Sequence, residues 1–261
     1  MLNEYKKEFF NLDHDWGYVI YPKNISENIP VVLHFHGNRG YVKDGEADWL
    51  DEPKKQHFFK PVLDSGFAIA GCHATGNHWG RGSAIRANYK FFEQLKNNIE
   101  LNLSNITTWG CGLGASAAWL TSIGELNPYV KNFISQQGVL NFESVIRREK
   151  FKDELIEAHN RDVSMDIKKA VQVFDPINPI TKTKLMIAKN EKKIPNSLFI
   201  HGDADENVNY SENPVMLNKL LSDTGANSKL NPLAGVGHAT YEHGEELGLI
   251  IAKFLWANNL K

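Results

Sequence analysis

Short apolar runs and helical segments alternate along most of this 261-residue chain. The apolar runs have the length and composition of buried strands, and the stretches between them carry apolar residues at helical spacing. The strand-like runs are GYVIY (17–21), VVLHF (31–35), FAIAGC (67–72), ITTW (106–109), FIS (133–135) and SLFI (197–200), and the predicted helices are 53–65, 83–98, 115–123, 213–224 and 241–258. Because parallel strands need a crossover between them, this alternation predicts an α/β fold: a mostly parallel, doubly wound sheet flanked by helices.

One region interrupts the alternation. From about residue 138 to 193 the sequence is charged and favours helices before the turn-rich FDPINP. We therefore expect a single domain over residues 1–261 with a small helical cap insertion at about 138–193. Such an insertion would lie above the carboxyl ends of the strands, where open α/β sheets bind ligands.

The composition argues against several classes of partner. Lys and Arg number 29 against 31 Asp and Glu, so neither nucleic acid nor an anionic membrane is an expected partner. The apolar run near Leu249 is far too short to span a membrane, and the polar start MLNEYKKEFF lacks the apolar core of a signal peptide. With only Cys72 and Cys111, no disulfide framework is expected, and the sequence predicts a cytoplasmic protein.

The stretch TTWGCGLGASAAW (107–119) places three alternate glycines between a predicted strand and a predicted helix. One interpretation is a dinucleotide-binding loop, because Gly110, Gly112 and Ala115 fit G-x-G-x-x-A. That fingerprint also requires an acid at the end of the next strand, and VKNFIS is followed by two glutamines. The dinucleotide-binding fingerprint normally comes at the start of the sheet, whereas this turn follows several predicted strands. A dinucleotide-binding module is therefore the less favoured alternative.

The other interpretation is the nucleophile elbow, G-x-S-x-G, in which small flanking residues let a strand turn sharply into a helix. Gly110 and Gly114 take the flanking positions, so Gly112 takes the position of the nucleophile. Glycine has no side chain to attack a carbonyl, but it freely adopts the strained backbone conformation of an elbow. The pattern predicts a turn that is kept and a nucleophile that is absent.

The remaining parts of a catalytic triad follow in the chain order nucleophile, acid, histidine. SLFIHGDADENV (197–208) provides a strand followed by Asp205, and LAGVGHATYEHG (233–244) provides a glycine-rich turn with His238. Upstream, VVLHFHGNRG (31–40) is an apolar strand that ends in His-Gly and a loop. In such a sheet this loop supplies one oxyanion-hole amide, here that of Asn38, and the residue after the nucleophile, Leu113, supplies the other.

These segments, in this order, resemble the α/β-hydrolase family, and HFHGNRG, HGDADENV and GVGHATYEHG are most similar to its esterase and peptidase-like members. The resemblance covers roughly residues 17–260. It implies an eight-stranded, mostly parallel sheet, a Ser-His-Asp mechanism without a cofactor, and ester, thioester or amide substrates. By position it also implies that Asp205 orients the imidazole, that His238 is the general base, and that Asn38 and Leu113 bind the oxyanion.

Neighbouring residues offer alternatives for these roles. Cys111 adjoins the vacant position, but buried cysteines usually serve as small apolar fillers. Ser116 would place the elbow one helical turn late, among alanines that favour helix. Asp203 is a rival acid that we expect to cap a loop, and His243 is a rival base that we expect on the surface of the last helix.

Four histidines fall near the carboxyl ends of two predicted strands: His34, His36, His73 and His78. We expect no metal site, because the two rings of HFH lie on opposite faces of a strand and no clustered carboxylate completes a ligand set. The predicted pocket residues are His36, Gly37, His78, Trp79 and Cys111.

Three interpretations of Gly112 remain open. The chain is a hydrolase whose serine was deliberately replaced, or a natural pseudo-hydrolase that binds a small ligand or a partner, or an enzyme in which His238 and Asp205 activate water directly. The polar segment from 141 to 175 favours a small or polar acyl substrate over a long-chain lipid.

Overall fold

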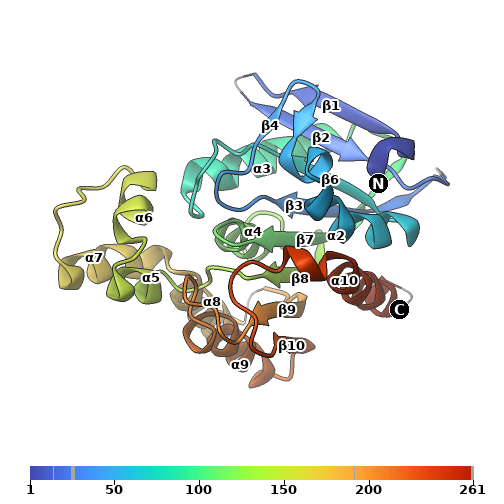
Figure 1. Cartoon of the computed structure of the whole chain (residues 1–261). Coiled ribbons are helices and arrows are strands. Elements are labelled where there is room, and N and C mark those ends of the chain that lie inside the picture. Colours follow the sequence, from blue (N-terminus) through green and yellow to red (C-terminus); the bar gives the residue numbers. More distant parts are fainter. Residues whose placement is uncertain (14, 25–26, 191, 260–261) are drawn as a thin grey trace.

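A computed structural model describes residues 1–13, 15–24, 27–190 and 192–259 of the chain. An eight-stranded sheet with the strand order β1-β2-β6-β3-β7-β8-β9-β10 forms its centre (Figure 1). Its strands are β1 (Lys7–Asn11), β2 (Trp16–Ile20), β3 (Ile29–Phe35), β6 (Ala68–Cys72), β7 (Leu101–Cys111), β8 (Val130–Gln136), β9 (Asn196–Gly202) and β10 (Ser228–Leu233). Only β2 pairs antiparallel with its neighbours, β1 and β6, while the other described pairings in this sheet are parallel. The predicted α/β fold with a mostly parallel sheet is confirmed.

Helices cover both faces of the sheet (Figure 1). On one face lie α3 (Gly82–Leu95), α4 (Gly114–Ser122), α8 (Pro179–Lys189) and α9 (Met216–Ser222), and on the other lie α1 (Asp48–Asp51), α2 (Pro53–Asp64) and α10 (Gly244–Asn259). Successive strand residues alternate between the two cores: in β3, Leu33 and Phe35 join the first and Val32 joins the second. Since both faces are buried, the central strands read as continuous apolar runs.

A third apolar cluster lies over the carboxyl ends of the central strands. It joins α5 (Phe142–Arg148), α6 (Lys152–Ala158) and α7 (Ile167–Phe174) to Leu113, Val139 and Val208, which follow β7, β8 and β9. These helices form the yellow segment at one side of the sheet in Figure 1. α8, from the same predicted insertion, packs in the sheet core through Ile180 and Met186. The assignment of 138–193 as a cap on a single domain stays a prediction.

Element bounds depart from the sequence-based expectation at the edges of the sheet. β1 and β10 were not predicted, because KEFFN and SKLNPL are only partly buried and mix charged or polar residues with apolar ones. β7 and β8 are longer than ITTW and FIS. A 3-10 turn, η4 (Tyr241–His243), precedes α10, and a π turn, η3 (Ser211–Val215), precedes α9. The remaining short elements are η1 (Leu2–Glu4), η2 (Asp175–Ile177), β4 (Val42–Lys43) and β5 (Glu46–Ala47).

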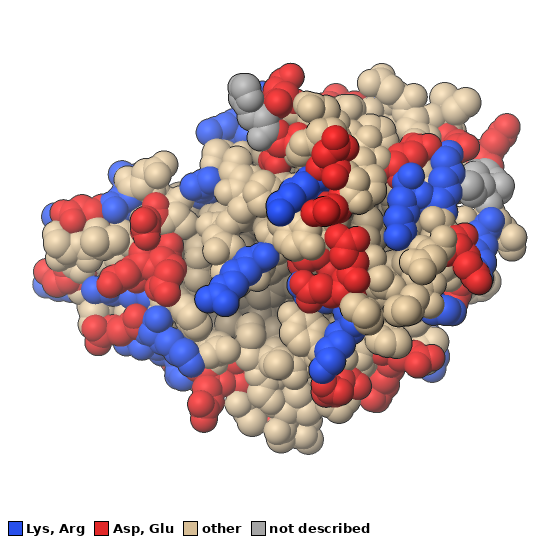
Figure 2. Space-filling model, turned by 45° about the horizontal axis from the view of Figure 1, so that its top comes forward, with Lys and Arg blue, Asp and Glu red and all other residues tan. Residues whose placement is uncertain are grey.

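The surface mixes charges of both signs. On the face in Figure 2, Lys and Arg side chains are interspersed with Asp and Glu, and the surface is hollowed near its centre. Among the helices that the structure describes, none is both long and apolar enough to cross a membrane.

Candidate active site

The turn between β7 and α4 is made by Gly112, whose φ is +51°. A residue with a Cβ pays about 1–2 kcal/mol in this left-handed region. The turn is held on both sides, because Gly112 N donates to Gln136 O at 3.0 Å and Gly112 O accepts from Val139 N at 2.9 Å. A Cβ at position 112 would meet no atom closer than Gly37 Cα, at 3.9 Å. The site therefore has room for a side chain, and only the backbone conformation favours glycine.

The flanking glycines of the turn have a different reason to be small. A Cβ on Gly110 would overlap the backbone of Ala115, and one on Gly114 would overlap the carbonyl oxygens of Phe35 and His36. These two positions are where α4 packs closely against β7 and β3. The flanking positions of the predicted elbow, Gly110 and Gly114, thus form a tight strand-to-helix turn with the open position, Gly112, at its centre.

Asp205 and His238 meet across two loops. Asp205 follows β9, His238 precedes η4, and His238 Nδ1 lies 2.8 Å from Asp205 Oδ2. The carboxylate is buried, whereas the imidazole side chain is 35% exposed. Asp205 Oδ1 also accepts from the amides of Asn207 at 2.8 Å and Val208 at 2.9 Å. Two backbone hydrogen bonds within its own loop therefore hold the Asp205 carboxylate in place, independently of His238.

A second histidine, which the sequence reasoning missed, also contacts this acid. His201 is fully buried in β9, and its Nε2 lies 3.0 Å from Asp205 Oδ2 and 2.9 Å from Val208 O. Burial by itself would raise the pKa of Asp205, but hydrogen bonds from His201 and His238 outweigh it and hold that pKa well below its ordinary value. The carboxylate is therefore ionised at neutral pH. The sequence signal for this contact is that His201 stands four residues before Asp205.

The two amides expected to bind an oxyanion border the same cavity. In the described part of the chain, neither Asn38 N nor Leu113 N donates to a protein acceptor. The loop of Asn38 is fixed beside it, because Arg39 N donates to Asn77 Oδ1 at 2.7 Å. A Cβ on Gly37 would lie 3.1 Å from Cys111 O, so the two loops are in close contact. Both amides are free to donate to a ligand.

The cavity enclosed by these loops has a volume of about 240 Å³. Of the predicted pocket residues, Gly37, Trp79 and Cys111 line it. His36 and His78 do not line it, which corrects the sequence-based expectation. His36 Nε2 lies 2.8 Å from His73 O, and buried His78 accepts from Gly80 N at 3.1 Å. These two rings support the loop that carries Trp79.

Polar groups that the sequence did not single out line part of this cavity. They include Asp48, Lys55, Gln136, Gln137 and Thr240. Lys55 Nζ lies 2.7 Å from Asp48 Oδ2, and both residues are buried. Gln136 Nε2 donates to Thr240 Oγ1 at 3.3 Å. Their sequence context resembles any helix or strand end, so only the tertiary fold brings them together.

The rival residues have other contacts. Cys111 Sγ lies 3.4 Å from Gln136 Oε1, and burial raises the pKa of this thiol well above its ordinary value. Ser116 Oγ donates to Val139 O at 2.6 Å, and Asp203 Oδ1 accepts from Gly235 N at 2.7 Å. His243 lies in η4, 3.9 Å from Glu246. Over the described residues, no group of three or more His, Cys, Asp or Glu side chains is placed to hold a metal ion.

Comparisons with known proteins agree with this geometry at the level of the fold. No protein-family model matches the chain, and no curated protein matches it in sequence. A truncated form of a carbohydrate esterase from gut microbiota matches with a TM-score of 0.76 at 15% identity, over 99% of this chain and 98% of that one. Est1E from Butyrivibrio proteoclasticus matches with a TM-score of 0.71 at 18% identity, over 98% and 99%. The acylaminoacyl peptidase of Pyrococcus horikoshii matches with a TM-score of 0.68 at 16% identity, over 100% of this chain and 42% of that one. The chain therefore has the α/β-hydrolase fold over nearly its full length.

Proposed function

We propose that the chain is an esterase-type α/β-hydrolase with the nucleophile position occupied by Gly112, so that it binds small ester or acyl compounds but is inactive or impaired as it stands. The observation that supports this most is the 2.8 Å contact between His238 Nδ1 and Asp205 Oδ2 beside an open turn at position 112. A binding protein has no chemical need for a buried acid paired with a partly exposed imidazole.

The hydrogen bond to Asp205 determines which ring nitrogen of His238 can accept a proton. With Nδ1–H donated to Asp205, His238 presents Nε2 as a proton acceptor, and in the described structure Nε2 has no protein partner. The amides of Asn38 and Leu113 would stabilise the oxyanion that forms when a carbonyl is attacked. The site thus has a base and an anion-binding region, and lacks only the attacking group.

Glycine closes the covalent route, because no side chain can form an acyl-enzyme. A water molecule deprotonated by His238 is the attacking group that remains. Without a positioned nucleophile, this hydrolysis is slow or absent. Replacement of Gly112 by serine would restore the missing hydroxyl, and no atom stands within 3.4 Å of the added Cβ.

The first prediction is that Gly112→Ser hydrolyses p-nitrophenyl acetate at least about a hundredfold faster than the parent chain, because a positioned hydroxyl then meets an aligned base. The activity is lost again in Gly112→Ser with His238→Ala. A fluorophosphonate probe phosphonylates Gly112→Ser with loss of HF and leaves the parent unmodified, as intact-mass spectrometry would show.

Gly112→Ala is the matched control, since it adds the Cβ and the same backbone strain without the hydroxyl. The proposal fails if a folded Gly112→Ser is no more active than Gly112→Ala on a panel of short acyl esters. Turnover by the parent that depends on His238 would instead identify water activation. Silence from every variant would favour a pseudo-hydrolase that binds a ligand. A thermal shift with NAD would revive the dinucleotide alternative.

The second prediction concerns the acyl group. The cavity of about 240 Å³ is small, and Asp48, Lys55 and Thr240 line it. A long alkyl chain that lies against these polar groups gains less from apolar burial than it would against an apolar wall, and a cavity of this size has little room for it. We therefore expect Gly112→Ser to have a higher kcat/KM for p-nitrophenyl acetate than for the octanoate. Faster hydrolysis of octanoyl or longer esters would contradict this substrate class.

A further inference from the structure

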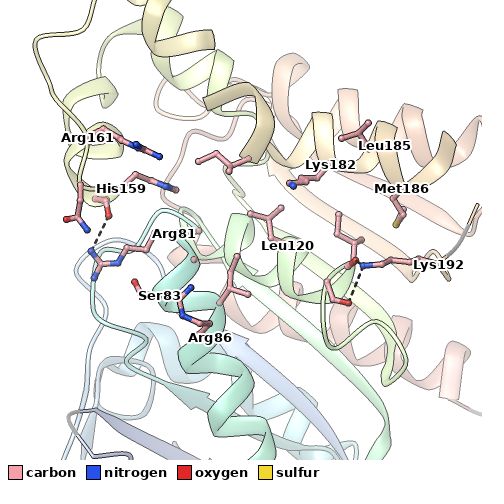
Figure 3. Close-up of a pocket in the computed structure, with 18 of the residues that line it drawn as sticks. Arg81, Ser83, Arg86, Leu120, His159, Arg161, Lys182, Leu185, Met186 and Lys192 are labelled. Carbon is pink, nitrogen blue, oxygen red and sulfur yellow. Dashed lines mark hydrogen bonds between the residues drawn. The ribbon is translucent and has the colours of Figure 1, made fainter. Parts of the chain in front are cut away.

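A second, larger cavity lies on another side of the molecule. It has a volume of about 640 Å³ and is bordered by α3, α4, the segment after α6, and α8 (Figure 3). None of the residues that line it also lines the candidate active site. Cavities of several hundred cubic ångströms have the size of small-molecule sites. The roles proposed above leave this groove unused.

The charged residues among the described lining of the groove are all cationic. Six lining residues are Lys or Arg and no described one is Asp or Glu, although acids and bases are nearly equal in number along the chain. The cations are Arg81, Arg86, Arg161, Lys182, Lys189 and Lys192. In Figure 3, Arg81, Arg86 and Arg161 lie on one side of the opening and Lys182 faces them from α8. A concave surface with one charge sign concentrates ions of the opposite sign.

The positive charge at one end is not neutralised by the described residues. Arg86 folds back over the start of α3, because its Nη1 would lie 3.3 Å from a Cβ placed on Gly82. That first turn has no acidic residue and no side-chain cap. A cation beside the positive end of a helix is unfavourable unless an anion is present. Arg86, Arg161 and Lys182 make no ion pair with any described carboxylate.

Arg81 is held in place at the same end. Its Nη1 donates to Ala158 O at 3.1 Å and its Nη2 donates to Thr75 Oγ1 at 2.7 Å, while its buried Nε has no hydrogen-bond partner among the described residues. Burial lowers the pKa of the neighbouring His159, and the charges of Arg81 and Arg161 lower it further. The neutral imidazole thus adds no charge to this end of the groove.

Apolar side chains fill the space between the cations. They are Ile85, Leu120, Ile123, Ile177, Leu185 and Met186. Leu185 lines the groove and is 50% exposed, so it offers apolar surface to a ligand. We propose that this groove binds a small amphipathic anion, whose phosphate or carboxylate group contacts the arginines and lysines and whose apolar body lies on these side chains. Guanidinium groups are well suited to such oxygen acceptors.

The test is calorimetric titration of the whole chain with octyl phosphate, inorganic phosphate and octyl glucoside, each below its micelle concentration. We expect saturable one-to-one binding of octyl phosphate, weaker binding of inorganic phosphate and none of octyl glucoside. Arg86→Gln with Lys182→Gln should weaken octyl phosphate binding by about tenfold or more. Activity of Gly112→Ser plays no part in this readout, so the result is independent of the proposed function.

The matched control is Lys90→Gln with Lys184→Gln. It removes the same charge from exposed positions of α3 and α8 that do not line the groove, and octyl phosphate should bind it within about twofold of the parent. If both double variants weaken octyl phosphate binding equally, the effect depends only on net charge and the proposal is overturned. The absence of saturable binding, or equally tight binding of inorganic phosphate, would overturn it too. Cosedimentation with phosphatidylglycerol vesicles that needs Arg86 and Lys182 would assign the groove to a membrane and also overturn it.

Discussion

At the scale of single residues, Asp205 is the most constrained group in the candidate site. Its two oxygens face two imidazoles and two backbone amides. The sequence indicated Asp205 and His238 through their loops and their chain order. It did not indicate His201, because a histidine inside a strand is as often a satisfied core residue. The contact depends on where the chain after β9 folds back, which is a tertiary property.

The third prediction follows from the pKa of Asp205, which is lower in the folded chain than the unfolded value of about 3.9. The ionised carboxylate therefore stabilises the fold above about pH 4, and this contribution is lost as the pH falls from there toward the folded pKa. In urea denaturation between pH 5 and pH 2.5, the unfolding free energy of the parent should fall more steeply than that of Asp205→Asn.

Asp203→Asn is the control for this measurement. Asp203 is exposed, and it accepts only from Gly235 N among the described contacts. In Asp203→Asn, the unfolding free energy should fall with decreasing pH as steeply as it does in the parent. Parallel curves for the parent and Asp205→Asn would show that the two histidines do not stabilise the charged carboxylate.

At the scale of elements, two positions of the β7–α4 turn require glycine for different physical reasons. Gly112 is required only by its φ of +51°, whereas Gly114 is required by contact with the carbonyls of Phe35 and His36 at the end of β3. The sequence predicted this turn from spacing alone, because alternate glycines at a strand-to-helix junction are typical of a backbone that turns sharply there. It also assigned the strained conformation to Gly112 and small size to the flanking positions, and the structure identifies the backbone atoms that a Cβ at each flank would meet.

The fourth prediction is that Gly112→Ala lowers the unfolding free energy by about 1–2 kcal/mol, the cost of a Cβ in the left-handed region. Gly114→Ala should cost at least about 3 kcal/mol, because the backbone of β3 has to move away from the new methyl group. Chemical denaturation at neutral pH measures both changes. Equal costs for the two variants would contradict the distinction between conformation and packing.

At the scale of the whole molecule, α5 to α7 pack around a cluster of their own. Their buried residues, such as Phe142, Leu155 and Phe174, belong to a core separate from the two that sandwich the sheet. The sequence predicted that this region departs from the strand and helix alternation. It did not separate α8, which returns to the sheet core through Ile180 and Met186.

The fifth prediction is that α6 and α7 open without unfolding the sheet. Since their apolar contacts lie outside the sheet cores, amides from Lys152 to Phe174 should exchange hydrogen at lower opening free energy than those of β7 and β8. Native-state exchange followed by mass spectrometry measures this difference. One common opening free energy for these helices and the two strands would show that they unfold as a single unit.

The sequence by itself determined the fold class and the order of the functional segments, because burial on both sheet faces and the small residues of a sharp turn leave local patterns. It also predicted a pairing of Asp205 with His238 and an open turn at Gly112, and in the structure His238 Nδ1 lies 2.8 Å from Asp205 Oδ2. Only the tertiary structure placed His201 on Asp205, put Asp48 and Lys55 in the small cavity, withdrew His36 and His78 from its wall, and gathered the cations of the larger groove. Apart from His201, which stands four residues before Asp205, these side chains reach their places from elements far apart in the chain. Their proximity depends on how helices and loops pack over the sheet, and no local pattern of residues encodes that packing.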